Sequence, residues 1–230
     1  AANNLLKRVK VITRFAVDMN IIKADPLIGM RKLKYKTKSI PTWGQGEIEK
    51  FAKRHPSGTK AHLAMTIMRC TGQRLSDAVK MGWQHVKDGR IEICQQKTGT
   101  FVTIPLHPDL KAAIAPLSRD AETFLLTEYG KPFAAAGFGN WMRDRCDEAG
   151  LPDLSSHGLR SAMATALAEA GCSAKELMSI TGHKSLAEAE VYIRAAEQKL
   201  LSANAMKALS KAEKGTKSAN PNPKVSKSAA

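Results

Sequence analysis

Six side chains in this sequence have types that suit a single kind of chemistry. They are Arg74, Lys97, His157, Arg160, His183 and Tyr192. Two arginines can clamp the non-bridging oxygens of a phosphate with paired hydrogen bonds and stabilise extra negative charge in a transition state. A tyrosine hydroxyl can attack phosphorus, and a lysine or histidine can move the protons. The set therefore offers a candidate for every role in phosphodiester cleavage without a metal ion or cofactor.

His157 and Arg160 lie in the string SSHGLR. Ser155 and Ser156 are candidate N-caps, which would place His157 at a helix start and Arg160 one turn later on nearly the same side. A helix N-terminus with a histidine and an arginine suits anion binding. A capping histidine beside an ordinary exposed arginine would give the same string.

Arg74 follows a predicted apolar helix and a glycine, and Asp77 comes three residues later. Asp77 could orient the arginine or cap a helix, although a surface Arg–Asp pair with little effect on stability is the ordinary alternative. Lys97 is expected at the tip of a hairpin. There it is either a simple turn residue or a cation that reaches a DNA groove.

His183 follows Gly182 between two predicted helices. Residues 174–193 also fit a helix-turn-helix that reads bases. Tyr192 projects roughly 80° from the centre of its helix's apolar stripe, at the rim, if each residue turns the helix by about 100°. A rim position lets the hydroxyl emerge at a cleft, but a partly buried structural tyrosine would have the same pattern.

The elements that must position these side chains are mainly helical. Thr42 and Gln45 predict a capping box for a helix containing Ile48 and Phe51. Apolar periodicity predicts further helices over 3–20, 60–71, 75–82, 108–115, 134–149, 157–170, 174–181, 186–198 and 201–210. Between them the period changes, and short strands with tight turns are expected around Val86, Ile91–Ile93 and Val102–Ile104.

The charge of the chain favours a polyanionic partner. The 230 residues carry 36 Lys+Arg against 21 Asp+Glu, a net charge of +15 with a pI of about 9.8. A membrane is not expected as a partner, because no apolar run approaches the ~18 residues of a spanning helix. The four cysteines are too widely spaced for a zinc site or a disulfide framework, and no phosphate-loop or dinucleotide motif is present. A cytoplasmic protein that does not use ATP is therefore expected.

Basic residues also concentrate in one short segment, residues 31–38. They are Arg31, Lys32, Lys34, Lys36 and Lys38. They predict a linker, residues 27–41, that is either simply solvated or in contact with a DNA backbone. The final residues, 213–230, contain one aliphatic side chain larger than alanine, Val225, and are expected to form a disordered basic tail.

Taken in order, the six residues resemble the active-site set of the tyrosine recombinases, the phage integrase family. The strings TGQRLSDAVKMGW, SSHGLR and ITGHKS, with a tyrosine nine residues after His183, carry the resemblance. It covers residues 42–212 as a catalytic domain, and it implies an α+β, mainly helical fold with a small antiparallel three-stranded sheet. Residues 1–26 look like the last helical part of a preceding core-binding domain. Ser161 departs from many relatives, which carry a bulkier or basic residue there.

The resemblance implies a role for each residue. Tyr192 would attack the scissile phosphate and form a 3′-phosphotyrosine bond, which stores the energy needed for rejoining. The others would assist it: Arg74 and Arg160 by binding non-bridging oxygens, Lys97 as general acid, His157 in proton transfer, His183 by hydrogen-bonding the phosphate, and Asp77 in a supporting role.

The implied protein is the integrase of a bacterial mobile element, working on double-stranded DNA near the nucleoid. The family assembles as a homotetramer on synapsed sites, and the state of this chain alone stays open between monomer and oligomer. Two alternatives remain. One is a type IB topoisomerase-like enzyme that relaxes DNA, and the other is a non-catalytic helix-turn-helix protein.

Overall fold

The computed structural model describes residues 2–34 and 41–218, with side chains up to residue 213. The chain divides into two units between residues 39 and 40, a boundary that falls inside the predicted linker. None of the described helices combines the length and apolar character that crossing a membrane requires.

The first unit contains one helix, α1 (Ala2–Asp18), close to the predicted 3–20. The chain after it returns along the helix. The Asn3 side chain exchanges two hydrogen bonds with the backbone of Leu33, at 3.0 and 2.8 Å, and Lys10 donates to the Met30 carbonyl at 2.6 Å. The apolar side chains of α1 stay largely exposed, including Leu5, Val11, Ile12 and Phe15.

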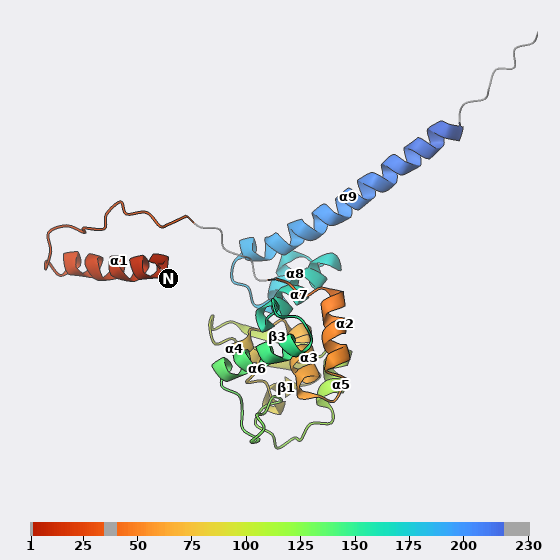
Figure 1. The fold of residues 1–230 in the computed structure, drawn as a ribbon, viewed down its shortest axis with the longest axis horizontal. Helices are drawn as coiled ribbons and strands as arrows, with labels where there is room; N and C mark the ends of the chain where they lie inside the picture. The colour runs from red at the N-terminus through yellow and green to blue at the C-terminus, as the bar shows by residue number, and fades with distance from the viewer. Residues whose placement is uncertain (1, 35–40, 219–230) are drawn as a thin grey trace, which may run out of the picture. The chain divides into compact units, whose positions relative to one another are not determined.

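The second unit contains the remaining elements. Its elements are α2 (Gln45–Arg54), α3 (Lys60–Thr71), α4 (Leu75–Ala78), the 3-10 helix η1 (Trp83–His85), β1 (Val86–Lys87), β2 (Arg90–Cys94), β3 (Phe101–Pro105), α5 (Pro108–Ile114), α6 (Ala135–Glu148), α7 (Ser156–Glu169), α8 (Ala174–Thr181) and α9 (Leu186–Ser218). Helix α3 lies inside the unit and packs against α5 and α7, and α7 in turn packs against α8 and α9 (Figure 1). The mainly helical α+β fold is confirmed.

The three strands form the antiparallel sheet expected, in the order β1-β2-β3. Ile91 pairs with Ile104 and Ile93 pairs with Val102, and these four side chains are buried on one face. Asp88 and Gly89 both have positive φ, at 46° and 72°, as the tight turn between β1 and β2 requires. The sheet thereby fixes the base of the β2–β3 hairpin that carries Lys97.

Three predictions about helices in the second unit were wrong: the cap of α2, the end of the helix predicted over 75–82, and the division of the C-terminal helix. The N-cap of α2 is Gly44, two residues after the expected Thr42: the Glu47 carboxylate accepts the Gly44 backbone N–H at 2.9 Å, and Thr42 lies outside the cap. The helix predicted over 75–82 ends at Ala78, because the chain turns there before η1.

The third correction concerns the C-terminal helices. The helices predicted over 186–198 and 201–210 are one helix, α9, because the residues between them are good helix formers with no glycine or proline. Residues 213–218 of the predicted disordered tail continue this helix, since extending a helix is easier than nucleating one. The rest of the predicted tail, 219–230, lies outside the described residues.

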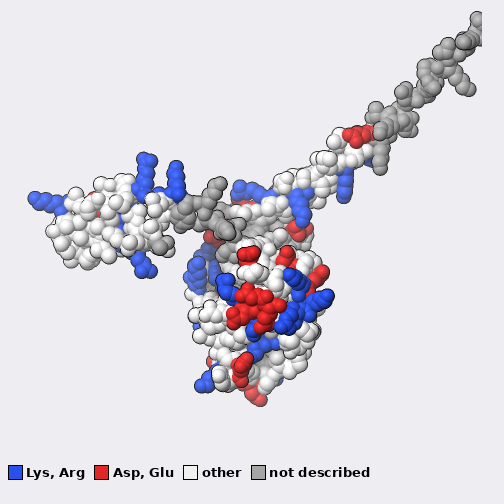
Figure 2. All heavy atoms as spheres, viewed as in Figure 1, with Lys and Arg blue, Asp and Glu red and all other residues white. Residues whose placement is uncertain are grey.

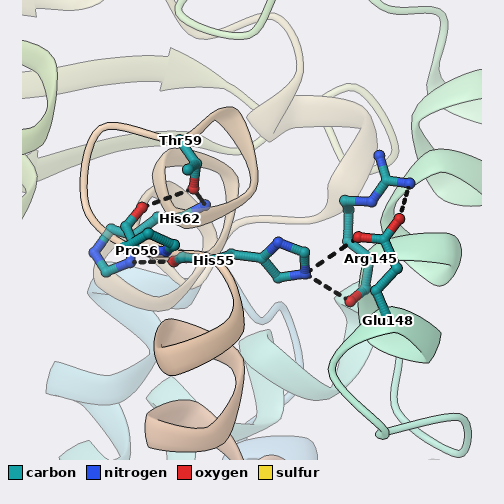
Figure 3. Close-up of polar contacts among 6 residues, drawn as sticks. All are labelled: His55, Pro56, Thr59, His62, Arg145 and Glu148. Carbon is teal, nitrogen blue, oxygen red and sulfur yellow. Dashed lines mark hydrogen bonds and ion pairs between the residues drawn. The ribbon is translucent and has the colours of Figure 1, made fainter.

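A buried histidine joins α2 to α6 (Figure 3). The His55 ring donates from Nε2 to the Arg145 carbonyl at 2.9 Å and lies 3.8 Å from the Glu148 carboxylate. The backbone carbonyl of His55 accepts a bond from the His62 ring at 3.2 Å, and Thr59 caps α3 by accepting the His62 N–H. These contacts tie the end of α2 to α6 and to the first turn of α3.

Candidate active site

The six predicted residues all lie in the second unit, on segments that meet at the ends of α3, α7 and α8. Arg74 is the N-cap residue of α4, and Lys97 lies in the turn between β2 and β3. His157 and Arg160 lie in the first turns of α7. His183 follows Gly182, the αL residue that ends α8, and Tyr192 lies in the second turn of α9.

Arg160 is held at one nitrogen and unpartnered at the other. Its Nη1 donates to two backbone carbonyls, of Gly72 at 2.8 Å and of Thr181 at 2.6 Å. Its Nη2 is buried and has no hydrogen-bond partner in the part of the chain described. Burial and the nearby charge of Arg74 lower the pKa of Arg160 to about 10, so it remains cationic at neutral pH. A buried donor without a partner is costly, and an anionic oxygen would satisfy it.

Arg74 is half-buried and lies close enough to Arg160 to lower its pKa. Its Nη1 donates to Oε1 of Gln95 at 2.7 Å. Gln95 is fully buried, although it is an amide. The two guanidinium groups are thus fixed near each other by partners that come from three separate segments of the chain.

Asp77 serves the hairpin rather than the arginine in this structure. Its side chain is 1% exposed, and Oδ1 accepts the backbone N–H of Gln96 at 2.9 Å, which ties the short helix α4 to the end of β2. Oδ2 is buried and has no hydrogen-bond partner among the described residues. This contact with the hairpin is neither of the two roles considered for Asp77, which were orienting Arg74 and capping a helix.

Lys97 is exposed and makes no hydrogen bond or ion pair with the described residues. Its charge nevertheless contributes to the field at His157. Burial lowers the pKa of His157, and the cations Arg160, Arg74 and Lys97 lower it further. His157 therefore lies near Arg160, Arg74 and Lys97, on the same side of the fold.

His183 is half-buried, and its pKa is lowered to about 4, first by burial and then by Arg160. Its Nδ1 lies 2.7 Å from Oγ1 of Thr181, and that hydroxyl donates its one proton to the Leu177 carbonyl, also at 2.7 Å. Nδ1 must therefore carry the proton and donate it to the hydroxyl oxygen. Neutral His183 then presents Nε2 as an acceptor, so that it must gain a proton before Nε2 can donate to a phosphate.

The Tyr192 hydroxyl reaches a polar partner instead of packed hydrocarbon. The ring is half-buried against a small cluster that includes Leu177 and Ala189, with its centroid 6.2 Å from that of His183. The hydroxyl donates to Oγ of Ser161 at 3.4 Å. Because Ser161 directly follows Arg160 in α7, this contact brings the phenol beside the arginine, and Tyr192 in turn acts to raise the pKa of Arg160.

Sequence reasoning missed four residues that shape this site. They are Gln73, Gln95, Ser161 and Thr181, which supply its hydrogen-bond partners. Only Gln95 carried a usable signal: it continues the inward alternation of Ile91 and Ile93, so the period-two pattern places a polar amide on the buried face. Ser155, expected as a side-chain cap for α7, makes no such bond, and its carbonyl accepts Trp43 Nε1 instead.

The basic segment lies partly outside the described residues. Arg31, Lys32 and Lys34 are exposed in the first unit, whereas Lys36 and Lys38 are not described. Figure 2 shows basic side chains along the first unit, while the face of the second unit turned to the viewer mixes acidic and basic groups.

One group among the described residues has metal-ligand geometry. Cys70, His107 and Asp109 place their ligand atoms within 4.8 Å of one another, although their spacing in the sequence gave no sign of it. His107 and Asp109 are exposed, and burial raises the pKa of the Cys70 thiol to about 11, which disfavours the thiolate that a metal binds. The group contains none of the predicted catalytic residues.

Known proteins similar to this chain share both its sequence pattern and its fold. Tyrosine recombinase XerC of Roseiflexus castenholzii is 25% identical over 150 residues, which is 60% of this chain and 48% of that protein. The integrase of Escherichia phage lambda is 29% identical over 143 residues, 56% of this chain and 40% of that one. A crystal structure of a lambda integrase dimer bound to a COC′ core site matches with a TM-score of 0.73 and 25% identity, covering 84% of this chain and 58% of that one.

The chain spans about half the length of the curated relatives it matches. The family model described as "Phage integrase family" matches residues 46–199, which include all six predicted catalytic residues. The chain therefore belongs to the phage integrase family of tyrosine recombinases.

Proposed function

We propose that this chain is the catalytic part of a site-specific DNA recombinase, an integrase of a mobile element, that cleaves and rejoins strands through a covalent 3′-phosphotyrosine. The observation that carries the proposal is the state of Arg160. Its guanidinium is anchored at Nη1, while Nη2 is buried and unpartnered. Membership of the integrase family supports the same conclusion.

In the proposed reaction the Tyr192 oxygen attacks phosphorus, and the bond from phosphorus to the 5′-oxygen breaks. Arg74 and Arg160 hold the non-bridging oxygens, where negative charge accumulates. The phenol proton passes toward His157, whose lowered pKa leaves it neutral and able to accept. Lys97 donates a proton to the leaving 5′-oxygen. Attack by a 5′-hydroxyl on the phosphotyrosine reverses these steps and rejoins a strand without ATP.

The partners and organisation follow from the same proposal. The substrate is double-stranded DNA, and the working assembly is a homotetramer on two synapsed sites in the bacterial cytoplasm, at the nucleoid. One structural relative, lambda integrase, is known as a tetramer bound to a Holliday junction. Residues 1–26 would be the end of a core-binding domain, 27–41 a basic linker, and the catalytic domain would begin at residue 42.

The test is covalent trapping on a suicide duplex, in which a nick next to the cleavage point lets the released 5′-end diffuse away. Because the recognised site is unknown, a pool of nicked duplexes is used, and products are separated on a denaturing gel. We expect a protein–DNA adduct that Tyr192→Phe abolishes. Tyr129→Phe is the matched control, since Tyr129 is 89% exposed on a loop, and it should form the adduct normally.

Two outcomes would overturn the proposal. An adduct that survives Tyr192→Phe would move the nucleophile elsewhere, and absence of any adduct with intact DNA binding would favour the non-catalytic alternative. Relaxation of a supercoiled plasmid without strand exchange would indicate the topoisomerase-like alternative instead.

A further inference from the structure

Gln95 has a fully buried side chain whose amide is hydrogen-bonded on both sides. Its Oε1 accepts from Nη1 of Arg74 at 2.7 Å and from the Thr98 hydroxyl at 2.8 Å. Its Nε2 donates to Oε1 of Gln73 at 2.6 Å and to the Thr181 carbonyl at 2.8 Å. An amide has two acceptor sites and two donor hydrogens, so every hydrogen-bonding position of this group is used.

These partners fix the direction in which the amide points. If it were flipped, the NH₂ group would face the Arg74 guanidinium and the oxygen would face the Thr181 carbonyl, two repulsive contacts in a buried site. A buried amide whose hydrogen-bonding positions are all used is held rigidly, and other orientations of it are strongly disfavoured. Gln95 therefore holds its neighbours in one arrangement.

The network connects both arginines of the proposed reaction. The Thr181 carbonyl that accepts from Gln95 also accepts from Nη1 of Arg160, at 2.6 Å. Arg74 is thus linked to Arg160 through one amide and one carbonyl. The bond from Thr98 fixes the same amide to the hairpin turn, directly beside Lys97. Three groups with separate roles are positioned from one side chain.

The turn between α8 and α9 lies directly against this amide. Gly182 has a φ of +68°, and a Cβ added to it would lie 2.3 Å from Gln95 Nε2. Only glycine allows so close an approach. Gln73 adds a link to the last turn of α8, because its Nε2 donates to the Ile180 carbonyl at 2.8 Å.

We propose that Gln95 is a positioning residue for phosphate recognition. It holds the Arg74 guanidinium at a fixed spacing from Arg160 and holds the hairpin that bears Lys97 against them. The proposal rests on the function proposed above, since it assigns to Gln95 the placement of groups used in that reaction. Gln95 itself touches no reacting atom, because all of its hydrogen-bonding positions are used within the protein.

The test is a double-mutant cycle on single-turnover cleavage of a suicide substrate, at saturating protein. Gln95→Met keeps the size of the side chain and removes all four bonds, and we expect cleavage to fall about tenfold to hundredfold with DNA binding retained. Arg74→Lys keeps the charge but loses the fork geometry, and it should also slow cleavage. Because Gln95 is proposed to act partly through Arg74 and partly through the hairpin, Gln95→Met should cost several-fold less in the Arg74→Lys background than in the wild-type protein.

Gln84→Met is the control, because Gln84 is exposed and its side chain bonds the Glu122 carbonyl outside the site. It should leave the cleavage rate unchanged. Thermal melting is measured for every variant, and if Gln95→Met fails to fold, Gln95→Asn replaces it, since asparagine keeps the amide but is too short to reach Arg74.

The proposal is overturned if the two losses multiply in the double variant, or if a folded Gln95 variant cleaves at the wild-type rate. Either result requires that the wild-type protein forms the adduct. Absence of the wild-type adduct would instead overturn the proposed function, and this inference with it, so the two failures are distinguishable.

Discussion

At the scale of single residues, the site is built so that charge is concentrated before any phosphate arrives. Arg160 is buried beside Arg74, and both histidines have lowered pKa values because they share this environment. Such a cluster is electrostatically unfavourable without an anion. In the proposed reaction an incoming phosphate would relieve this repulsion, so that its binding energy would be directed to the group that reacts.

His183 provides the pH test at this scale. Its pKa of about 4 results from burial and from Arg160, so the imidazole should be neutral throughout the neutral range in the DNA-free protein. Removing the cation with Arg160→Gln should raise the pKa of His183, although burial, the larger cause, should keep it below the ordinary value of about 6.5. In Tyr192→Phe protein bound to DNA it should also rise, because a nearby phosphate favours the protonated ring.

The measurement is an NMR titration of the histidine ring protons, with the His183 signal assigned by its loss in His183→Gln. A His183 signal that titrates near the ordinary value without DNA would contradict the environment described here. An unchanged pKa on DNA binding would show that His183 does not face the phosphate.

The catalytic candidates could be read from the sequence, but the contacts that place them could not. Arg160 and His183 stand in short, recognisable strings. Their partners, however, are backbone carbonyls of Gly72 and Thr181 and the amide of Gln95, which come from distant parts of the chain. A backbone carbonyl has no sequence signature, so only the folded chain shows which one an arginine meets.

At the scale of elements, the turn between α8 and α9 couples the fold to the site. Gly182→Ala should destabilise the protein by about 1–3 kcal/mol, because alanine is strained at positive φ and its Cβ would collide with Gln95. Gly171→Ala is the matched control: Gly171 has a φ of +85°, but no atom lies within 4 Å of the added Cβ.

The free energy of unfolding is measured by denaturant titration, and cleavage by the suicide substrate. Gly182→Ala should lose more stability than Gly171→Ala and should also lose cleavage, whereas the control should lose stability alone. Equal effects of the two substitutions on both measurements would show that the contact with Gln95 has no consequence.

Element boundaries show where local sequence rules end. The sheet register was predictable, because Ile91, Ile93 and their partners alternate and a one-residue slip would expose them all. The division of α9 into two helices was wrong, since that prediction followed the apolar stripe rather than helix-breaking residues. The cap of α2 was misplaced because Gly44 has no side chain that could signal a cap in the sequence. Its backbone N–H donates to the Glu47 carboxylate instead.

At the scale of the whole molecule, the positive charge should serve affinity rather than chemistry. The net charge of +15 is larger than the charge that the six site residues carry. The first unit also has exposed cations at Arg31, Lys32 and Lys34. Cations that pair with phosphates release counterions, so each lost contact should reduce the slope of log K against log salt by about 0.9.

Replacing these three residues by glutamine together should therefore weaken DNA binding and flatten its salt dependence, by up to about 3 in slope if all three contact phosphates. Cleavage at saturating protein should stay at the wild-type rate, because the substitutions leave the second unit untouched.

The control is the matched triple substitution of Lys87, Lys111 and Lys131, which are exposed in the second unit. Binding is measured by fluorescence anisotropy across a salt series. If the first triple variant kept the wild-type slope while the control lost it, the DNA-contacting cations would belong to the second unit and the basic segment would be only a solvated linker.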